Sequence, residues 1–375
     1  MRSVRTLVAV FCVAGLLLAP SASARCTLRP DLLVRTGTGS VIHALDVKGC
    51  GSRTVAYAAD RALDVPLGNG FLTDPSWLPG GRSFVYGWTH GAAFIADSTE
   101  IRKGFVRGGA SMTLLKLPLA GIITEVAASP DGRRIAFTLY TPNYPVAYAT
   151  WTPVGSPVRI YVVNTDGTGL QPVSTVSVTW DSNAVWSPDS RKLAFISGRG
   201  QTSVYVTDLK PGPGLVGTRV SPLDVWAVAP TWAPDGRHLA FEGWTIAPDP
   251  WTLLGNERSV WTVAPDGKGA RRIGEGQTPS YAPDGRHLVV STRSGLAVLD
   301  VVRRRSRSLT DHESDGYPVW SPDGRLIAFH RWGDPTIDGD GITRFGPDAT
   351  WTIRPDGRGA VSRGLEDYGI PAWRR

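Results

Sequence analysis

The chain has little of several residue types on which reactive proteins depend. Its 375 residues include three cysteines, two methionines and six histidines. No Cys-x-x-Cys pair, His-Glu-x-x-His sequence, Gly-x-Ser-x-Gly elbow or phosphate-binding loop occurs, so the usual signatures of redox and zinc centres, metallopeptidases, serine hydrolases and nucleotide-binding enzymes are missing. Helical periodicity is also scarce beyond the N-terminus, which argues against a helical or mixed fold.

Only one long apolar run is present, and it lies at the N-terminus. Arg2 and Arg5 precede the apolar residues 7–19, and Ala22-Ser23-Ala24 forms a small-residue cleavage motif. The run is shorter than the roughly 20 residues that a membrane-spanning helix needs. We predict a signal peptide over residues 1–24, an uncleaved anchor being the alternative. The mature chain, 25–375, is then secreted or otherwise extracytoplasmic (periplasm or cell envelope) and has no membrane span.

Removal of the signal peptide would also remove Cys12. Cys26 and Cys50 then remain as an even pair in an oxidising compartment, and no cluster of Cys and His suggests a metal instead. We therefore predict a Cys26–Cys50 disulfide.

Glycine and proline are abundant, with 43 and 29 residues, and they recur in a ten-residue unit. In Trp320-Ser-Pro-Asp-Gly-Arg-Leu-Ile-Ala-Phe329, Pro sets φ for a turn, Asp caps the backbone and Gly accepts positive φ. The unit predicts a strand ending in an aromatic residue, a tight turn and a buried second strand. Further copies begin at Trp77, Ala128, Trp186, Trp232 and Tyr281.

Each hairpin is followed by a third strand, a turn and a short fourth strand, as in Ser259-Val-Trp-Thr-Val-Ala-Pro-Asp-Gly267. Four antiparallel strands that recur every 39 to 58 residues are typical of propeller blades. The repeat resembles that of TolB-like β-propellers, relatives of the WD-type repeat, over nearly the whole mature chain. The resemblance implies the fold and leaves the function open, because propellers have many unrelated roles.

The repeat is out of phase with the ends of the chain. Residues 32–37 and 40–46 look like second and third strands, whereas Gly369-Ile-Pro-Ala-Trp373 matches a first strand, Gly316-Tyr-Pro-Val-Trp320. We therefore predict an all-β single domain, a propeller of seven four-stranded blades, in which the C-terminal strand completes the N-terminal blade. Six or eight blades are the alternatives.

Strand direction sorts the connections onto two faces. The tight turns share one face, and the longer second-to-third loops share the other with the blade-to-blade connections. Long loops with aromatic residues on a rigid face are a usual place for binding, although the same residues could instead pack over blade edges. The aromatic candidates for ligand binding are Tyr144, Trp151, Trp244, Trp251 and Trp332.

Acidic residues recur just before the predicted first strands, near the channel mouth, at Asp74, Glu125, Asp181, Asp224, Glu275, Asp315 and Asp367. Such a ring could hold a cation or meet a cationic group; the alternative is that these are ordinary loop residues. We take Asp181, Asp315 and Asp367 as ligand-binding candidates.

Few residues suggest a cofactor or catalysis. Asp334, Asp338 and Asp340 invite a calcium site, but no Glu completes a calcium loop, and a solvated turn is the alternative. Gly212–Gly217 matches a dinucleotide fingerprint by letters only, because no βαβ unit surrounds it. His312 lies among acidic residues and is the one candidate for acid–base work. We otherwise predict no cofactor.

The formal charge of +7 falls to +5 without Arg2 and Arg5. Excess arginine suits an anionic surface partner, and an exported chain without a recognition motif is not expected to bind nucleic acid. The sequence favours a secreted, monomeric, non-catalytic propeller that binds protein or a cell-envelope polysaccharide. The alternatives are an extracellular propeller enzyme of lyase or hydrolase type, with a metal or acid–base site at the channel mouth, and a scaffold within a larger envelope complex.

Overall fold

The computed structural model describes the following residues of the chain: 31–36, 41–47, 51–57, 70–92, 95–117, 121–141, 157–173, 180–198, 201–209, 217–245, 257–333, 335–337, 343–345, 348–363 and 370–374. The predicted signal peptide and the predicted Cys26–Cys50 disulfide lie outside these residues. Within them, no helix has the length and apolar character to cross a bilayer.

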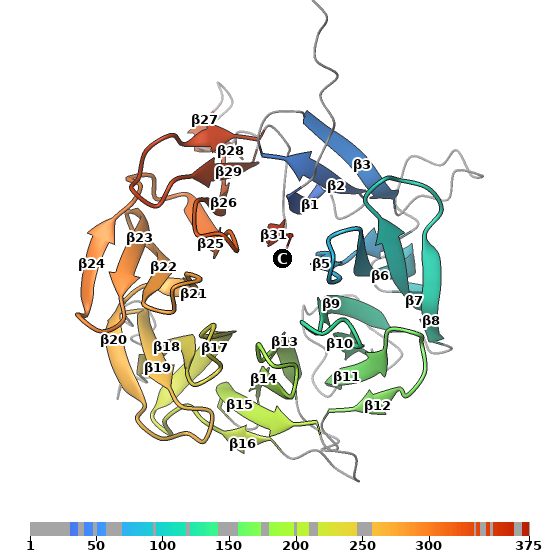
Figure 1. Cartoon of the computed structure of the whole chain (residues 1–375), viewed down its shortest axis with the longest axis horizontal. Helices are drawn as coiled ribbons and strands as arrows, with labels where there is room; N and C mark the ends of the chain where they lie inside the picture. The colour runs from blue at the N-terminus through green and yellow to red at the C-terminus, as the bar shows by residue number, and fades with distance from the viewer. Residues whose placement is uncertain are drawn as a thin grey trace, which may run out of the picture.

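Figure 1 shows strands arranged as blades around a central axis, with the chain passing from blade to blade. Seven antiparallel sheets surround this axis, which confirms the predicted all-β propeller and its seven blades. The innermost strands, numbered by blade from the first to the seventh, are β31 (Ala372–Trp373), β5 (Ser76–Trp77), β9 (Ile122–Ala128), β13 (Asp181–Trp186), β17 (Val225–Trp232), β21 (Gln277–Tyr281) and β25 (Asp315–Trp320).

The outer strands follow in the same blade order. Second strands are β1 (Leu32–Thr36), β6 (Ser83–Ala92), β10 (Arg134–Tyr140), β14 (Lys192–Ser197), β18 (Leu239–Thr245), β22 (His287–Thr292) and β26 (Ile327–Arg331). Third strands are β2 (Val41–Asp46), β7 (Ile95–Phe105), β11 (Val158–Asn164), β15 (Ser203–Asp208), β19 (Ser259–Val263), β23 (Gly295–Asp300) and β29 (Ala349–Ile353). Fourth strands are β3 (Gly51–Tyr57), β8 (Met112–Leu117), β12 (Gln171–Pro172), β16 (Thr218–Arg219), β20 (Arg271–Glu275), β24 (Arg305–Ser308) and β30 (Val361–Ser362).

Two blades carry an additional element. In the second blade, β4 (Gly70–Leu72) pairs with β6 beyond the short β5. In the seventh, the hairpin of β27 (Pro335–Ile337) and β28 (Thr343–Phe345) is inserted between the second and third strands.

The first blade is completed from the opposite end of the chain. Trp373 and Ala372 of β31 pair with Leu32 and Leu33 of β1, as predicted. The indole of Trp373 also donates to the carbonyl of Val319 in the seventh blade at 2.9 Å. The ring therefore closes without an open sheet edge between its last and first blades.

The tight turns gather on one face, which we call the turn face. Within the third blade, the Thr165 amide of the third-to-fourth turn donates to Arg133 O of the first-to-second turn at 2.9 Å. The turn aspartates accept bonds from backbone amides, as Asp323 does from Arg325 at 3.1 Å and Asp266 does from Lys268 at 3.1 Å. Gly324 takes φ +69°, the conformation for which this turn needs glycine. The opposite side of the ring is the loop face.

The core lies within and between the blades and repeats like the sequence. A fully buried phenylalanine of the second strand stacks on an aromatic residue of the third strand in four blades, in the pairs Phe137–Tyr161, Phe195–Tyr205, Phe241–Trp261 and Phe329–Trp351. Each buried phenylalanine contributes about 1.5–3 kcal/mol of apolar burial. The repeat therefore specifies packing as well as turns.

Four first strands contain a bulge that the sequence analysis did not predict. The bulges place non-glycine residues at positive φ in equivalent positions, at Asn183, Ala229, Thr278 and Tyr317. Such backbone costs about 1–3 kcal/mol unless its surroundings hold it. In two cases the preceding blade supplies an acceptor: Asn183 N donates to Glu125 at 2.6 Å and Thr278 N donates to Glu242 at 3.1 Å.

The closing strand provides a test of ring stability. Trp373 is buried and is bonded to the seventh blade, so Trp373→Ala should lower the free energy of unfolding by about 3–5 kcal/mol. Trp332→Ala, which removes a part-exposed indole that packs within a single blade, should cost less, about 1–2 kcal/mol. Urea titrations of both variants measure this, and equal losses would contradict a special role of the closing strand.

The buried Glu242 provides a test of pH dependence. Burial raises the pKa of Glu242 above its ordinary value of 4.5, although the Thr278 amide and Arg258 act in the opposite direction. The folded state then binds a proton more tightly than the unfolded state does. The unfolding free energy of the wild type minus that of Glu242→Gln should therefore fall as pH rises above about 4.5.

Asp189→Asn is the matched control, because its sign is opposite. Hydrogen bonds from Ser187 and the Arg191 amide lower the pKa of Asp189 below 3.8. The difference between wild type and Asp189→Asn should thus rise with pH over the acid range and level off above about 3.8. Denaturant titrations from pH 3 to pH 7 would refute the assignment if both differences changed in the same direction.

Candidate functional site

The loop face is where first strands begin and second strands end. Five predicted site residues lie in the described part of the chain: Asp181, Trp244, His312, Asp315 and Trp332. The others, Tyr144, Trp151, Trp251, Asp334, Asp338, Asp340 and Asp367, lie outside the described residues. Asp315 and Trp332 come together in the seventh blade, whereas Asp181 belongs to the fourth blade and Trp244 to the fifth.

An exposed aromatic pair occupies the loop face of the seventh blade. Tyr317, at the bulge of β25, is 41% exposed, and Trp332, just after β26, is 39% exposed. Their ring centroids are 5.7 Å apart and their planes are inclined at 58°. We call Tyr317 and Trp332 the aromatic shelf.

The shelf is fixed from below. Trp332 N donates to Ser314 O at 3.0 Å, and its ring lies over Gly316, where a Cβ would come within 2.5 Å of it. The buried His330 ring meets Trp332 edge-on at a centroid distance of 4.7 Å. Only a residue without a side chain fits at position 316, so the indole has a defined seat.

Beneath the shelf lies a buried His–carboxylate pair. His330 Nε2 is 3.8 Å from Asp348 Oδ2, and Asp348 Oδ1 accepts a bond from Gly333 N at 2.9 Å. Burial lowers the pKa of His330, and the Asp348 carboxylate only partly opposes this, so the imidazole is neutral at pH 7. The pair is buried and supports Trp332 rather than facing solvent.

Asp315 is committed to an ion pair. Both of its oxygens accept from Arg331, at 2.5 and 2.9 Å, and the carboxylate is fully buried. The guanidinium in turn lies 4.5 Å from the centroid of the Trp351 ring. Asp315 therefore positions Arg331, and its role in ligand binding stays a prediction.

The same spatial arrangement, an indole covered by a guanidinium group that a carboxylate holds, recurs on other blades. Each indole is covered by an arginine that an acidic residue holds: Trp88, Arg102 and Glu100 in the second blade, and Trp244, Arg258 and Glu242 in the fifth. Arg258 lies 3.8 Å from the Trp244 centroid and 2.6 Å from Glu242. The candidate Trp244 is thus partly covered, and it also stacks on Trp226 at 6.1 Å.

The described members of the predicted acidic ring do not form a uniform rim of free carboxylates. Asp74 pairs with Arg35 at 2.7 Å, and Asp315 pairs with Arg331. Asp181 is fully buried, whereas Asp224 and Glu275 are exposed. Asp181 and Asp315 both begin a first strand, but Ser197 stands opposite Asp181 and Arg331 stands opposite Asp315.

His312 lies in the connection between β24 and β25, half-buried, and its carbonyl accepts a bond from Asp315 N at 3.0 Å. No group of three His, Cys, Asp or Glu side chains within the described ranges could hold a metal ion. The acid–base role of His312 and a calcium site at Asp334, Asp338 and Asp340 stay predictions.

Sequence reasoning missed several residues of the loop face. Tyr317, His330 and Asp348 belong to the seventh-blade site, and Trp180 is a further part-exposed indole beside Gly198. The repeat does mark the two tryptophans that were predicted: Trp244 and Trp332 both stand twelve residues after their strand-ending tryptophans, Trp232 and Trp320. The bulge that exposes Tyr317 has no comparable signal.

Comparisons with known proteins place the fold. No protein-family model matches the chain. Over 221 residues, 55% of its length, it is 27% identical to a protein of Bacillus subtilis described as the uncharacterized peptidase YuxL, of which it covers only 29%.

Several solved structures are similar. An oligogalacturonate lyase from Vibrio parahaemolyticus has a TM-score of 0.58 at 11% identity, covering 86% of this chain and 91% of that one. A puromycin-hydrolyzing peptidase from Mycobacterium tuberculosis has 0.55 at 13% identity, covering 91% of this chain and 54% of that one. TolB from Acinetobacter baumannii has 0.47 at 17% identity, with 92% and 65% covered. At such low identities, the TM-scores of 0.58 and 0.55 show a shared β-propeller fold alone.

Proposed function

We propose that this protein is a non-catalytic propeller that binds a partner on its loop face, with a cell-envelope polysaccharide as the first candidate and a protein as the second. The aromatic shelf is the observation that carries this proposal. Two adjacent rings, each about two-fifths exposed, are held in place by the buried His330 ring and by the seat over Gly316.

The chemistry of the shelf suits a sugar ring or a proline-like ring. An inclined Tyr–Trp pair offers two apolar faces with a hydroxyl and an indole N–H at their edges, and such aromatic side chains combine large contact area with few rotatable bonds. Preorganisation from Gly316 and His330 reduces the entropy cost of binding. Export of the chain, monomeric behaviour and an extracytoplasmic site of action belong to the same proposal.

An extracellular propeller enzyme is the alternative. It would use His312 with loop carboxylates at the channel mouth, as acid and base or around a divalent cation. Release of soluble fragments from a polysaccharide or peptide with multiple turnovers, and its loss in His312→Ala, would support the enzyme and replace the binding proposal.

The shelf predicts how binding responds to substitution. Trp332→Ala and Tyr317→Ala should each reduce retention of the protein on insoluble cell-envelope polysaccharide about tenfold, because each removes one stacking surface. Phe105→Ala is the matched control, since Phe105 is a similarly exposed aromatic residue (36%) at the end of β7 on the turn face. Sedimentation binding curves with unchanged dissociation constants for both shelf variants would contradict the proposal.

A further inference from the structure

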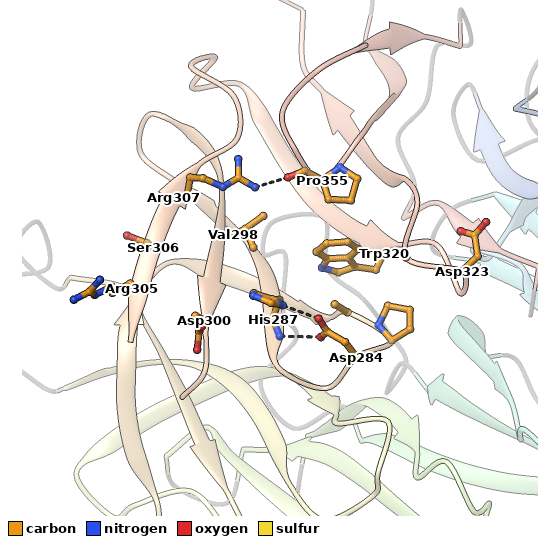
Figure 2. A pocket seen from close by; sticks show the side chains of 13 residues that line it. Asp284, His287, Val298, Asp300, Arg305, Ser306, Arg307, Trp320, Asp323 and Pro355 are labelled. Atoms are coloured by element: carbon orange, nitrogen blue, oxygen red, sulfur yellow. Dashed lines mark hydrogen bonds and ion pairs between the residues drawn. The ribbon is translucent and has the colours of Figure 1, made fainter. Parts of the chain in front are cut away.

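A cavity lies on the turn face, opposite the aromatic shelf. It has a volume of about 680 Å³ and opens between the sixth and seventh blades (Figure 2). Strands β22, β23 and β24 form one wall, and Trp320, the Asp323–Gly324 turn and Pro355 form the other. Its volume is within the range of small-molecule sites, and the proposed function makes no use of it.

The three carboxylates around this cavity already have partners. Figure 2 shows His287 beside Asp284, with Nδ1 and Oδ2 2.6 Å apart. Asp300 accepts from the amides of Val302 and Arg303, and Asp323 accepts from Ser321 Oγ and the Arg325 amide. The Arg303 amide lowers the pKa of Asp300; burial alone would raise that of Asp284 and Asp323, but their hydrogen bonds lower both. All three are ionised and serve to cap their own turns.

The hydrogen-bond donors around this cavity, in contrast, outnumber the acceptors that they bind. Among the described residues, no acceptor or acidic partner engages the exposed Arg305 at the rim. Arg307 reaches across the cavity and donates from Nη2 to Pro355 O, which leaves most of its five N–H groups available (Figure 2). His287 keeps Nε2 for a further bond. Arg303 and Arg325 lie 3.3 Å and 3.9 Å from the carboxylates of Asp300 and Asp323 and offset their charge, so the guanidinium groups of Arg305 and Arg307 favour an anion.

Trp320 distinguishes this junction from others around the ring. At four junctions the strand-ending indole donates to a carbonyl of the preceding blade, at 2.8–3.1 Å, from Trp77, Trp186, Trp232 and Trp373. Within the described part of the chain, the Trp320 indole N–H has no acceptor. Its ring instead lines the cavity with Val298 and Pro283, which gives the site an apolar wall.

We propose that this cavity binds a small oxyanion carried on a ring, a sugar phosphate or a sugar acid. The oxyanion would lie against Arg305 and the free N–H groups of Arg307, and the ring would lie against Trp320. The sugar phosphate and the sugar acid share this recognition chemistry, so the experiment tests both.

Titrations of the full mature protein labelled with ¹⁵N-tryptophan test the proposal. Glucose 6-phosphate and glucuronate are the probes, and glucose and inorganic phosphate are the controls. Trp320→Phe identifies the Trp320 indole resonance. We expect both charged sugars to shift this resonance saturably, inorganic phosphate to bind more weakly, and glucose to have no effect. An unmoved Trp320 resonance, or an equal response to glucose, would overturn the proposal.

Variants that remove one arginine distinguish binding in the cavity from non-specific attraction of anions to the basic turn face. Arg305→Ala should weaken the binding of glucose 6-phosphate about tenfold, the usual effect of losing a charged hydrogen bond. Arg286→Ala is the matched control, because Arg286 is an exposed arginine of the neighbouring turn that does not line the cavity. Equal losses in both variants would show non-specific attraction by the basic turn face and refute the assignment.

Discussion

The fold depends on a strand of two residues. Through β31, the carbonyl of Ala372 accepts the indole bond of Trp77 from the second blade, and Trp373 donates to the seventh. The same residues pair with β1 and complete the first blade. Every other junction joins neighbours in sequence, whereas this one joins the two ends of the chain, and the ring exists only if it forms.

Local chemistry explains why so much of the fold could be predicted. A Pro-Asp-Gly turn determines its own backbone angles, and its aspartate finds its partners two residues away, so the sequence alone reveals hairpins such as that at Asp323–Gly324. The phase of the repeat then led to β31. The bulges at Asn183 and Thr278 could not be predicted in this way, because their acceptors, Glu125 and Glu242, come from the preceding blade.

At the candidate site, too, features set by local sequence could be predicted, and features set by contacts between strands could not. Trp332 and Asp315 were found from their positions in the repeat, but the role of Asp315 was not, because Arg331 faces it only in the register of β25 and β26. The identity of the shelf as a pair depends on Tyr317, which an unusual φ brings beside Trp332. Long-range register and backbone strain leave little trace in a single sequence.

Glu125 and Glu242 each accept a hydrogen bond from the bulge of the following blade, so neighbouring blades must fit one another. In an open repeat array, a unit can be added or lost at an end with only one interface to refit. In this ring each blade contributes residues to two junctions, one on each side. The closing strand β31 can pair with β1 only when the number of blades completes the circle. Gain or loss of a single blade would change the angle at every junction at once, so a closed ring should tolerate changes of loop length far more easily than a change in the number of blades.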